Sequence, residues 1–263
     1  MKLPDKQKKP YRIGVAFSGG GARGFAHIGA IHAIQDLGLT PDIVAGVSAG
    51  AVVAVFYAAG LLDRHDDKLL KLFSGGKFTD FAKPRIPHDG FFSLDKFRHQ
   101  LEILIPYQNI EDLPLKTIVC ASDIDSGTKM AFDRGHLSER VVASCSIPIV
   151  FEPVDIDGRR YVDGGVLRNL PAYAIRHLCD FLIGINCSPM GDTPPAKGIV
   201  EIAKRTYRLM SKNNVTPDLE MCDVVVNLTE IANHQTFDLH DLELLVESGY
   251  LTTVKQLKNI SRP

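Results

Sequence analysis

A serine between two glycines, with an apolar run on each side, is the clearest chemical signal in this sequence. Gly46-Val-Ser48-Ala-Gly50 begins within the apolar residues 43–47 and precedes a longer apolar run, 51–62. In a Gly-x-Ser-x-Gly turn, the glycines let a strand and a helix approach closely while the serine takes a strained backbone angle. The hydroxyl is then exposed at a helix N-terminus. Ser48 is therefore a candidate nucleophile.

A serine nucleophile needs a neighbouring proton acceptor. Nine histidines are present, but none stands in a tight loop of small residues after a buried strand. Asp163 has that setting, because it follows Tyr161-Val162 and precedes Gly164-Gly165. A carboxylate can accept the serine proton directly if burial raises its pKa from about 3.9. The alternative is that Asp163-Gly164 is only a type I′ turn.

A glycine-rich loop, Ser18-Gly-Gly-Gly-Ala-Arg-Gly24, follows an apolar stretch at residues 11–17. Consecutive glycines at a helix N-terminus present unobstructed N–H groups, so Gly19, Gly20 and Gly21 are candidates for an oxyanion hole beside Ser48. Arg23 would then support the loop or guide an anionic headgroup. A solvated arginine at the start of a helix is the alternative.

The same loop also fits a different function. Gly19-x-Gly21-x-x-Gly24 matches the fingerprint of dinucleotide-binding proteins, after a strand and before a helix. That fingerprint also requires an acidic residue at the C-terminal end of the second strand. Asp42 precedes the second strand, and Ser48 occupies the end where the acid is needed. A nucleotide-binding oxidoreductase is therefore the alternative to an esterase.

The elements that would position these residues follow from the pattern of apolar residues. A strand at 11–17, a helix ended by Gly38, a strand at 43–47 and a second helix form a βαβα opening, which predicts a parallel sheet with helices on its faces. Further strands are expected at 115–121, 129–132, 182–186 and 224–227, with a hairpin at 154–162. Helices are expected from about 199 and over 238–258.

Residues 63–106 differ in character, because glycines and prolines interrupt short helical pieces. No central strand is expected there, and Ser93 is the expected N-cap of a helix that runs to Leu104. The segment is a candidate cap beside the site. Its phenylalanines either contact an acyl chain or form a satellite core under loops. They are Phe78, Phe81, Phe91 and Phe92.

Composition limits the remaining possibilities. The 263 residues, 45% of them hydrophobic, fit one α/β domain over 11–263 after a disordered lead-in, 1–10. A net charge of −1 argues against nucleic acid as a partner. Five widely spaced cysteines indicate reduced thiols in a cytoplasmic protein. The run 44–62 is better explained by a buried strand and helix than by a membrane span.

The motifs occur together in an order that resembles the bacterial patatin-like phospholipases. To the three glycine-bearing motifs the sequence adds Ala143-Ser144, Ile147-Pro148 and Phe151-Glu-Pro-Val154. The resemblance implies a three-layer α/β/α fold with a mostly parallel central sheet and a small helical cap. It also implies Ser48 as nucleophile, Asp163 as base and an oxyanion loop at Gly19, Gly20 and Gly21, with no catalytic histidine, metal or cofactor. Ile149 departs from the family pattern, where glycine commonly follows the proline.

These observations predict a serine acylhydrolase that cleaves acyl esters of phospholipids or related lipids through a Ser–Asp dyad and an acyl-enzyme. Gly46, Gly50, Gly164 and Gly165 would support the two catalytic residues by allowing close backbone approach. Contact with a membrane would be peripheral and transient. A catalytically silent lipid-binding module is a third alternative. The oligomeric state and the preferred headgroup are left open.

Overall fold

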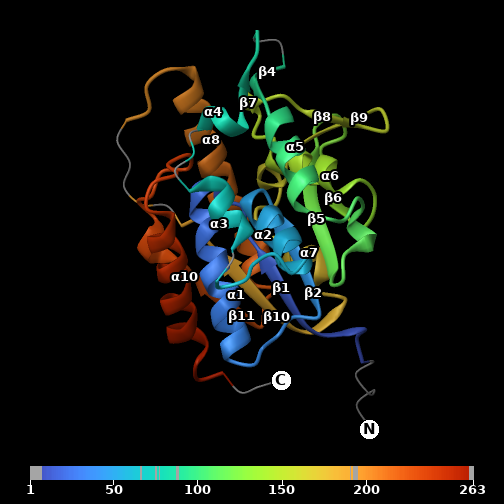
Figure 1. Cartoon of the computed structure of the whole chain (residues 1–263), viewed down its shortest axis with the longest axis vertical. Helices are drawn as coiled ribbons and strands as arrows, with labels where there is room; N and C mark the ends of the chain where they lie inside the picture. Colours follow the sequence, from blue (N-terminus) through green and yellow to red (C-terminus); the bar gives the residue numbers. More distant parts are fainter. Residues whose placement is uncertain are drawn as a thin grey trace.

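The central feature of the computed structural model is an eight-stranded sheet in the order β11-β10-β1-β2-β5-β9-β8, with β6 paired to β5 (Figure 1). The structure describes residues 8–65, 67–74, 76, 78–86, 89–189, 191 and 195–260. The pairs from β11 to β5 are parallel, whereas β6, β8 and β9 join antiparallel. The strands are β1 Tyr11–Phe17, β2 Ile43–Val47, β5 Lys116–Asp123, β6 Thr128–Phe132, β8 Val154–Ile156, β9 Arg159–Asp163, β10 Cys179–Asn186 and β11 Val224–Asn227.

Helices cover both faces of this sheet, as the sequence predicts. Side chains alternate along β1: Ile13, Val15 and Phe17 pack with α1, α2 and α10, while Ala16 packs on the opposite face with α7. Figure 1 shows α1 and α10 side by side on the first face. The helices are α1 Ala26–Asp36, α2 Ala49–Ala58, α6 Leu137–Cys145, α7 Ala172–Ile175, α8 Ile199–Asn214, α9 Thr216–Leu219 and α10 Leu242–Leu257.

The run 44–62 forms the end of β2, the Ser48 turn and the buried helix α2, so the preferred interpretation of this run is confirmed. Because β2 is covered on both faces, it is apolar throughout rather than alternating. In the part of the chain that the structure describes, no helix combines the length and the apolar character needed to cross a membrane.

The segment 63–106 is not purely helical. It contains α3 Lys68–Phe73, α4 Phe78–Phe81 and α5 Asp95–Leu104, but also β3 Lys83–Pro84 and β4 Gly90–Ser93. These two strands form a separate small sheet with β7 Ile149–Phe151, and none of them joins the central sheet. Ser93 ends β4 and donates to Asp95 Oδ2 at 2.9 Å, and the N-cap of α5 is Leu94, so the expected helix begins one residue later than a cap at Ser93 requires.

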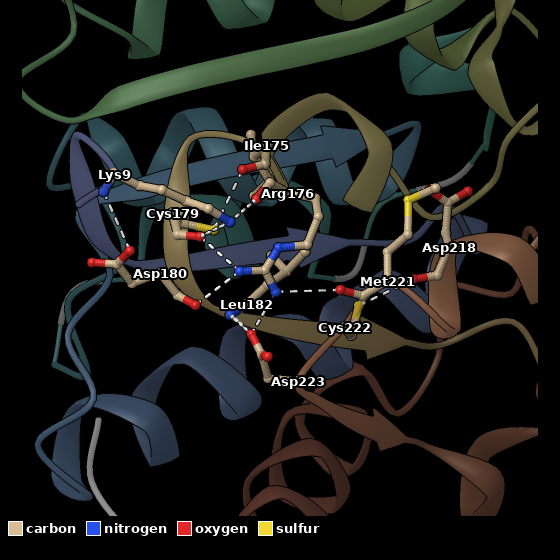
Figure 2. Close-up of polar contacts among 10 residues, drawn as sticks. All are labelled: Lys9, Ile175, Arg176, Cys179, Asp180, Leu182, Asp218, Met221, Cys222 and Asp223. Atoms are coloured by element: carbon tan, nitrogen blue, oxygen red, sulfur yellow. Dashed lines mark hydrogen bonds and ion pairs between the residues drawn. The ribbon is translucent and has the colours of Figure 1, made fainter. Parts of the chain in front are cut away.

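The described part of the chain starts at residues 8–10, which fall within the predicted lead-in, and Lys9 is bonded to the start of β10. Residues 1–7 lie outside the described part, but Lys9 donates through Nζ to the carbonyl oxygens of Arg176 at 2.7 Å and Cys179 at 3.0 Å. Figure 2 shows Arg176 beside it, with its guanidinium bonded to the carbonyls of Cys179 and Asp180 and to the Asp223 carboxylate. Charged side chains therefore form hydrogen bonds with the backbone carbonyls at the start of β10 and close to the start of β11.

Ile149 occupies a backbone conformation that suits glycine. Its φ is +72°, a region that is disfavoured for L-residues and especially for β-branched ones. A glycine after Pro148 would adopt this positive φ without steric strain. The side chain is 51% exposed, so the burial that it gains is limited. Residue 149 pairs with Gly90 of β4, where the small sheet borders the site.

We expect Ile149→Gly to be more stable than Ile149→Ala by about 1 kcal/mol, because both variants lose the same side-chain packing but only glycine relieves the positive φ. At an ordinary position, alanine is the more stable of the two by about 0.5–1 kcal/mol. Denaturant unfolding of the two variants at equal protein concentration measures the difference. The ordinary order, alanine above glycine, would contradict the strained conformation.

Candidate active site

The strand register of the sheet places Ser48 and Asp163 at nearly the same position along the strand direction, on either side of β5. Val47 of β2 lies opposite Cys120 of β5, and the next residue of β5, Ala121, lies opposite Asp163 of β9. Ser48 follows Val47, so only β5 separates the two residues. Adjacent strands are about 4.8 Å apart, which leaves the two backbones about 10 Å apart and lets their side chains meet above β5.

Ser48 stands in the strained turn that the sequence predicts. Its φ is +54° and its ψ is −126°, an unusual conformation for a residue with a side chain. Its N–H donates to Ser144 Oγ at 2.8 Å, and the Ser144 hydroxyl donates to the Cys120 carbonyl at 2.6 Å. The buried Ser144 thus ties the turn to β5.

The two glycines of the turn allow the close approach expected of them. A Cβ on Gly50 would lie 2.4 Å from the carbonyl oxygen of Phe17, and one on Gly46 would lie 2.2 Å from the carbonyl oxygen of Gly50. Both distances are shorter than a carbon–oxygen contact permits. Helix α2 can therefore begin directly against the ends of β1 and β2 only with glycine at both positions.

Asp163 is completely buried at the end of β9. Its Oδ1 accepts hydrogen bonds from Gly165 N at 2.9 Å and from the Tyr207 hydroxyl at 2.8 Å. Its Oδ2 has no partner at standard hydrogen-bond geometry, although the Ser48 hydroxyl is near enough to lower the pKa of the carboxyl group. Burial raises the pKa of Asp163 to about 6, against the opposing effects of Ser48, Gly165 and Tyr207.

The residues after Asp163 do not form the type I′ turn that was the alternative. They form a 3-10 turn, Gly164–Val166, which Asp163 caps with its side chain. A Cβ on Gly164 would lie 2.7 Å from the Cys120 carbonyl oxygen, and one on Gly165 would lie 2.1 Å from Tyr207 Oη. The chain can therefore turn tightly over β5 and against α8.

The glycine loop lies against Ser48, but its three glycines differ. The Gly19 N–H donates to the carbonyl of Asn169 at 3.0 Å, so it is not free to bind an oxyanion. Among the described residues, the N–H groups of Gly20 and Gly21 have no acceptor. Gly21 has a φ of +60°, and a Cβ there would lie 2.3 Å from the Thr236 carbonyl oxygen. The candidate oxyanion hole is therefore Gly20 and Gly21.

Arg23 is buried behind this loop, with 2% of its surface exposed. Its Nε donates to the Gly20 carbonyl at 3.3 Å and its Nη1 donates to the Pro189 carbonyl at 3.1 Å. Burial lowers its pKa to about 10. The solvated alternative is wrong, because the guanidinium is buried and donates to backbone carbonyls, among them that of Gly20 in the loop.

Ser48 opens onto an apolar pocket of about 140 Å³. The cap segment supplies part of the pocket wall. Of the four phenylalanines singled out in the sequence, Phe81 lines the pocket, whereas Phe91 and Phe92 do not. The side chain of Phe78 lies outside the described residues. Other aromatic side chains complete the pocket. They are Phe25, Phe73, Phe97, Phe151 and Phe237. Such a pocket is suited to an alkyl chain.

No histidine among the described residues lines the pocket at Ser48. His27, the buried one nearest the glycine loop, bonds through Nε2 to the Ser18 carbonyl at 2.8 Å. His177 is exposed in the turn after α7. Sequence analysis did not identify three residues that bond to the candidate site. The Tyr207 hydroxyl donates to Asp163, the Asn169 carbonyl accepts from Gly19 N–H, and the Ser144 hydroxyl accepts from Ser48 N–H. Tyr207 and Asn169 have no local motif, and only the Ala143-Ser144 pair was noticeable in the sequence.

The geometry disagrees with a dinucleotide site. Asp42, the only candidate for the ribose acid, lies at the start of β2 and accepts from the N–H groups of Arg12 and Ile13 at 3.1 and 2.9 Å. It is therefore at the opposite edge of the sheet from the glycine loop. In the described part of the chain, no group of three or more His, Cys, Asp or Glu side chains is placed to hold a metal ion.

Comparison with known proteins adds independent information. A model of the family described as patatin-like phospholipase matches residues 15–175. An uncharacterised NTE family protein of Mycobacterium tuberculosis is 37% identical over 162 residues, which are 61% of this chain and 44% of that protein. The chain thus spans less than half the length of this relative. The uncharacterised protein YqhO of Bacillus subtilis is 29% identical over 214 residues, covering 70% of this chain and 74% of YqhO.

Among solved structures, VipD from Legionella pneumophila superimposes with a TM-score of 0.64 over 98% of this chain and 72% of its own. Their sequences are 16% identical, so this similarity concerns the fold alone. The family match covers both residues that the sheet brings together and the glycine loop beside them. The chain belongs to the patatin-like phospholipase family.

Proposed function

We propose that this protein hydrolyses acyl esters of lipids through a dyad of Ser48 and Asp163. The observation that carries the proposal is the buried, raised-pKa carboxylate of Asp163, whose Oδ2 lacks a fixed partner and lies beside the strained nucleophile Ser48. The apolar pocket around Ser48 supports a lipid acyl chain as the substrate group. A protonated Asp163 would be inactive, so the ionised form is the base.

In the proposed reaction, Asp163 accepts the Ser48 proton as Oγ attacks the ester carbonyl. The N–H groups of Gly20 and Gly21 hold the oxyanion, each contributing on the order of 3 kcal/mol in the transition state. Protonated Asp163 then gives its proton to the leaving alkoxide, which leaves an acyl group on Ser48. A water molecule then gives a proton to Asp163 and attacks this ester, and Asp163 returns the proton to Ser48 Oγ as the bond to the acyl group breaks and the fatty acid is released.

A fluorophosphonate probe tests the proposal directly, because it reacts with activated serines. We expect one adduct, and peptide mapping by mass spectrometry should place it on Ser48. Folded protein that gives no adduct would favour a catalytically silent lipid-binding module. An adduct on another residue would show that Ser48 is not the nucleophile.

The Tyr207 hydroxyl is expected to set the pH range of the reaction. It donates to Asp163 and stabilises the carboxylate, so Tyr207→Phe should raise the Asp163 pKa further, by about one unit. The acid limb of kcat/KM, which in the wild type should lie near the Asp163 pKa of about 6, should move to higher pH.

Tyr173→Phe is the matched control for this shift. The Tyr173 hydroxyl is 3.5 Å from the Met130 carbonyl, on the other face of the sheet from the Ser48 pocket, and it does not touch Asp163. Its removal should leave the acid limb in place. A Tyr207→Phe variant that loses activity equally at all pH values would show that Tyr207 acts only in packing.

A further inference from the structure

The conformation of Gly20 brings two backbone N–H groups of the glycine loop to one side. Its φ is −179° and its ψ is 1°. A ψ near 0° eclipses the nitrogens of two successive residues across the Cα–C bond, so the N–H groups of Gly20 and Gly21 converge. Successive N–H groups arranged in this way form a concave site for an anionic oxygen. Gly21 lines the same pocket as Ser48, so this site borders the candidate nucleophile.

The direction of the Gly20 N–H is set by the peptide group to which it belongs. A trans peptide group is planar, and its C=O and N–H bonds point in opposite directions. No peptide bond in the described part of the chain is cis. The Gly19 carbonyl and the Gly20 N–H share one peptide group. The side chains that hold this carbonyl therefore also fix the direction of the N–H.

Side chains from outside the loop hold the Gly19 carbonyl. Asn169 Nδ2 donates to its oxygen at 3.3 Å, and the Ser188 hydroxyl donates to the same oxygen. The Cys187 thiol, a weaker donor, lies 3.5 Å from it. Hydrogen bonds that share one acceptor restrict its rotation, because turning the peptide would break all of them together. The Gly20 N–H is thus held pointing away from these side chains.

Asn169 is itself fixed in place and completely buried. Its N–H donates to Asn214 Oδ1 at 2.9 Å, and its carbonyl accepts from the Gly19 N–H at 3.0 Å. Its Oδ1 lies between two glycines, because a Cβ on Gly19 would be 2.6 Å from this atom and a Cβ on Gly165 would be 2.7 Å from it. The Gly165 N–H donates to Asp163. One buried amide therefore contacts both the glycine loop and the turn that holds the candidate base.

We propose that Asn169 and Ser188 are positioning residues for the oxyanion. By holding the Gly19 carbonyl, they keep the Gly20 N–H directed at the oxygen that becomes negative when Ser48 attacks an ester. Their hydrogen bonds also polarise the peptide group, which makes its N–H a stronger donor in the transition state. Neither side chain touches the substrate. The proposal rests on the acylhydrolase function proposed for Ser48 and deepens it.

Hydrolysis of p-nitrophenyl butyrate by Asn169→Ala and Ser188→Ala tests these roles. We expect kcat to fall by about 10- to 100-fold in Asn169→Ala, less than the roughly 10²- to 10³-fold cost of losing an oxyanion donor outright. In Ser188→Ala it should fall by about 3- to 10-fold, the equivalent of one neutral hydrogen bond. KM should change by less than about threefold in both, because the hole acts on the transition state. Asn169→Ala keeps the backbone carbonyl that accepts from Gly19 and removes only the side-chain contact.

Two inhibitors with the same carbon chain separate positioning of the oxyanion from a general disturbance of the pocket. The ketone 1,1,1-trifluoro-2-octanone forms a serine adduct that carries an oxyanion, whereas 1,1,1-trifluoro-2-octanol can occupy the apolar pocket but cannot form the adduct. The Ki of the ketone should rise by about the same factor as kcat falls in each variant, and the Ki of the alcohol should stay constant. An equal rise for both inhibitors would show that the substitutions disturb the pocket and would overturn the proposal.

Thr253→Val is the matched control for the loss of a buried hydrogen bond. Thr253 is completely buried on α10, where its hydroxyl donates to the Gly249 carbonyl at 2.7 Å, and it does not line the pocket. Its variant should be less stable but should keep kcat and both Ki values. Unchanged kcat and ketone Ki in both Asn169→Ala and Ser188→Ala, with normal wild-type turnover, would overturn the positioning roles and leave the acylhydrolase proposal standing. Absence of turnover in the wild type would refute the acylhydrolase, and the positioning roles with it.

Discussion

Ser48→Ala is expected to reduce ester hydrolysis by about 10⁴-fold or more and to abolish labelling by a fluorophosphonate. The loss is this large because no other hydroxyl in the described structure stands in a strained turn beside a buried carboxylate with an unpaired oxygen. The substitution keeps a Cβ at the position where φ is +54°, so the backbone strain remains and the fold should not relax. Steady-state rates and mass spectrometry of the labelled protein measure both effects.

Ser138→Ala provides the matched control for that experiment. Ser138 is a buried serine on α6, and its hydroxyl donates to Glu102 at 2.8 Å, away from the apolar pocket. Its variant should keep both activity and labelling. Retention of more than a few per cent of the activity by Ser48→Ala would rule out the acyl-enzyme at Ser48.

Asp163→Asn should lower kcat by about 10²- to 10⁴-fold, the contribution typical of a general base. An asparagine can keep the hydrogen bonds that Oδ1 receives from Gly165 and Tyr207, so the site should retain its shape. What it loses is the capacity to accept the Ser48 proton. Labelling by the fluorophosphonate should slow in parallel, because it depends on the same proton transfer.

The same variant should be more stable than the wild type near neutral pH. The folded-state pKa of Asp163, about 6, lies above its ordinary value of 3.8, so ionisation of this buried carboxyl disfavours the folded state. Wild-type stability should therefore fall as the pH rises between these two values, whereas an asparagine does not titrate. The difference in the free energy of unfolding should widen by on the order of 2 kcal/mol between about pH 4 and pH 7.

Denaturant unfolding of both proteins at a series of pH values measures this change. A constant difference across the range would mean that Asp163 is ionised as easily in the folded as in the unfolded protein. It would then be a poor general base at neutral pH.

The parts of the fold that local patterns specify were predictable. The apolar residues of β1 and β2, and the glycines on either side of Ser48, identify two parallel strands and the strained turn between β2 and α2. Asp163 was recognisable because it stands between a strand and two glycines. These features depend on neighbours in the chain, so the sequence displays them directly.

Features that depend on distant contacts were not predictable. The role of Tyr207 follows from a hydrogen bond to a residue 44 positions away, and the Gly19 N–H is occupied by a residue 150 positions away. The strand β3 has two residues, too few to show any alternation. Ile149 has a positive φ where it pairs with Gly90 in the small sheet, and its residue type gives no sign of that conformation.

Helix α8 reaches the candidate base from outside the segment that matches the family. Its Tyr207 donates to the Asp163 carboxylate and lies beyond residues 15–175, the segment of the family match. Substitutions on this helix are therefore expected to change the pH dependence proposed for Asp163 while Ser48 and Asp163 stay unchanged. The pH dependence can thus diverge between related proteins without any change in the two candidate catalytic residues.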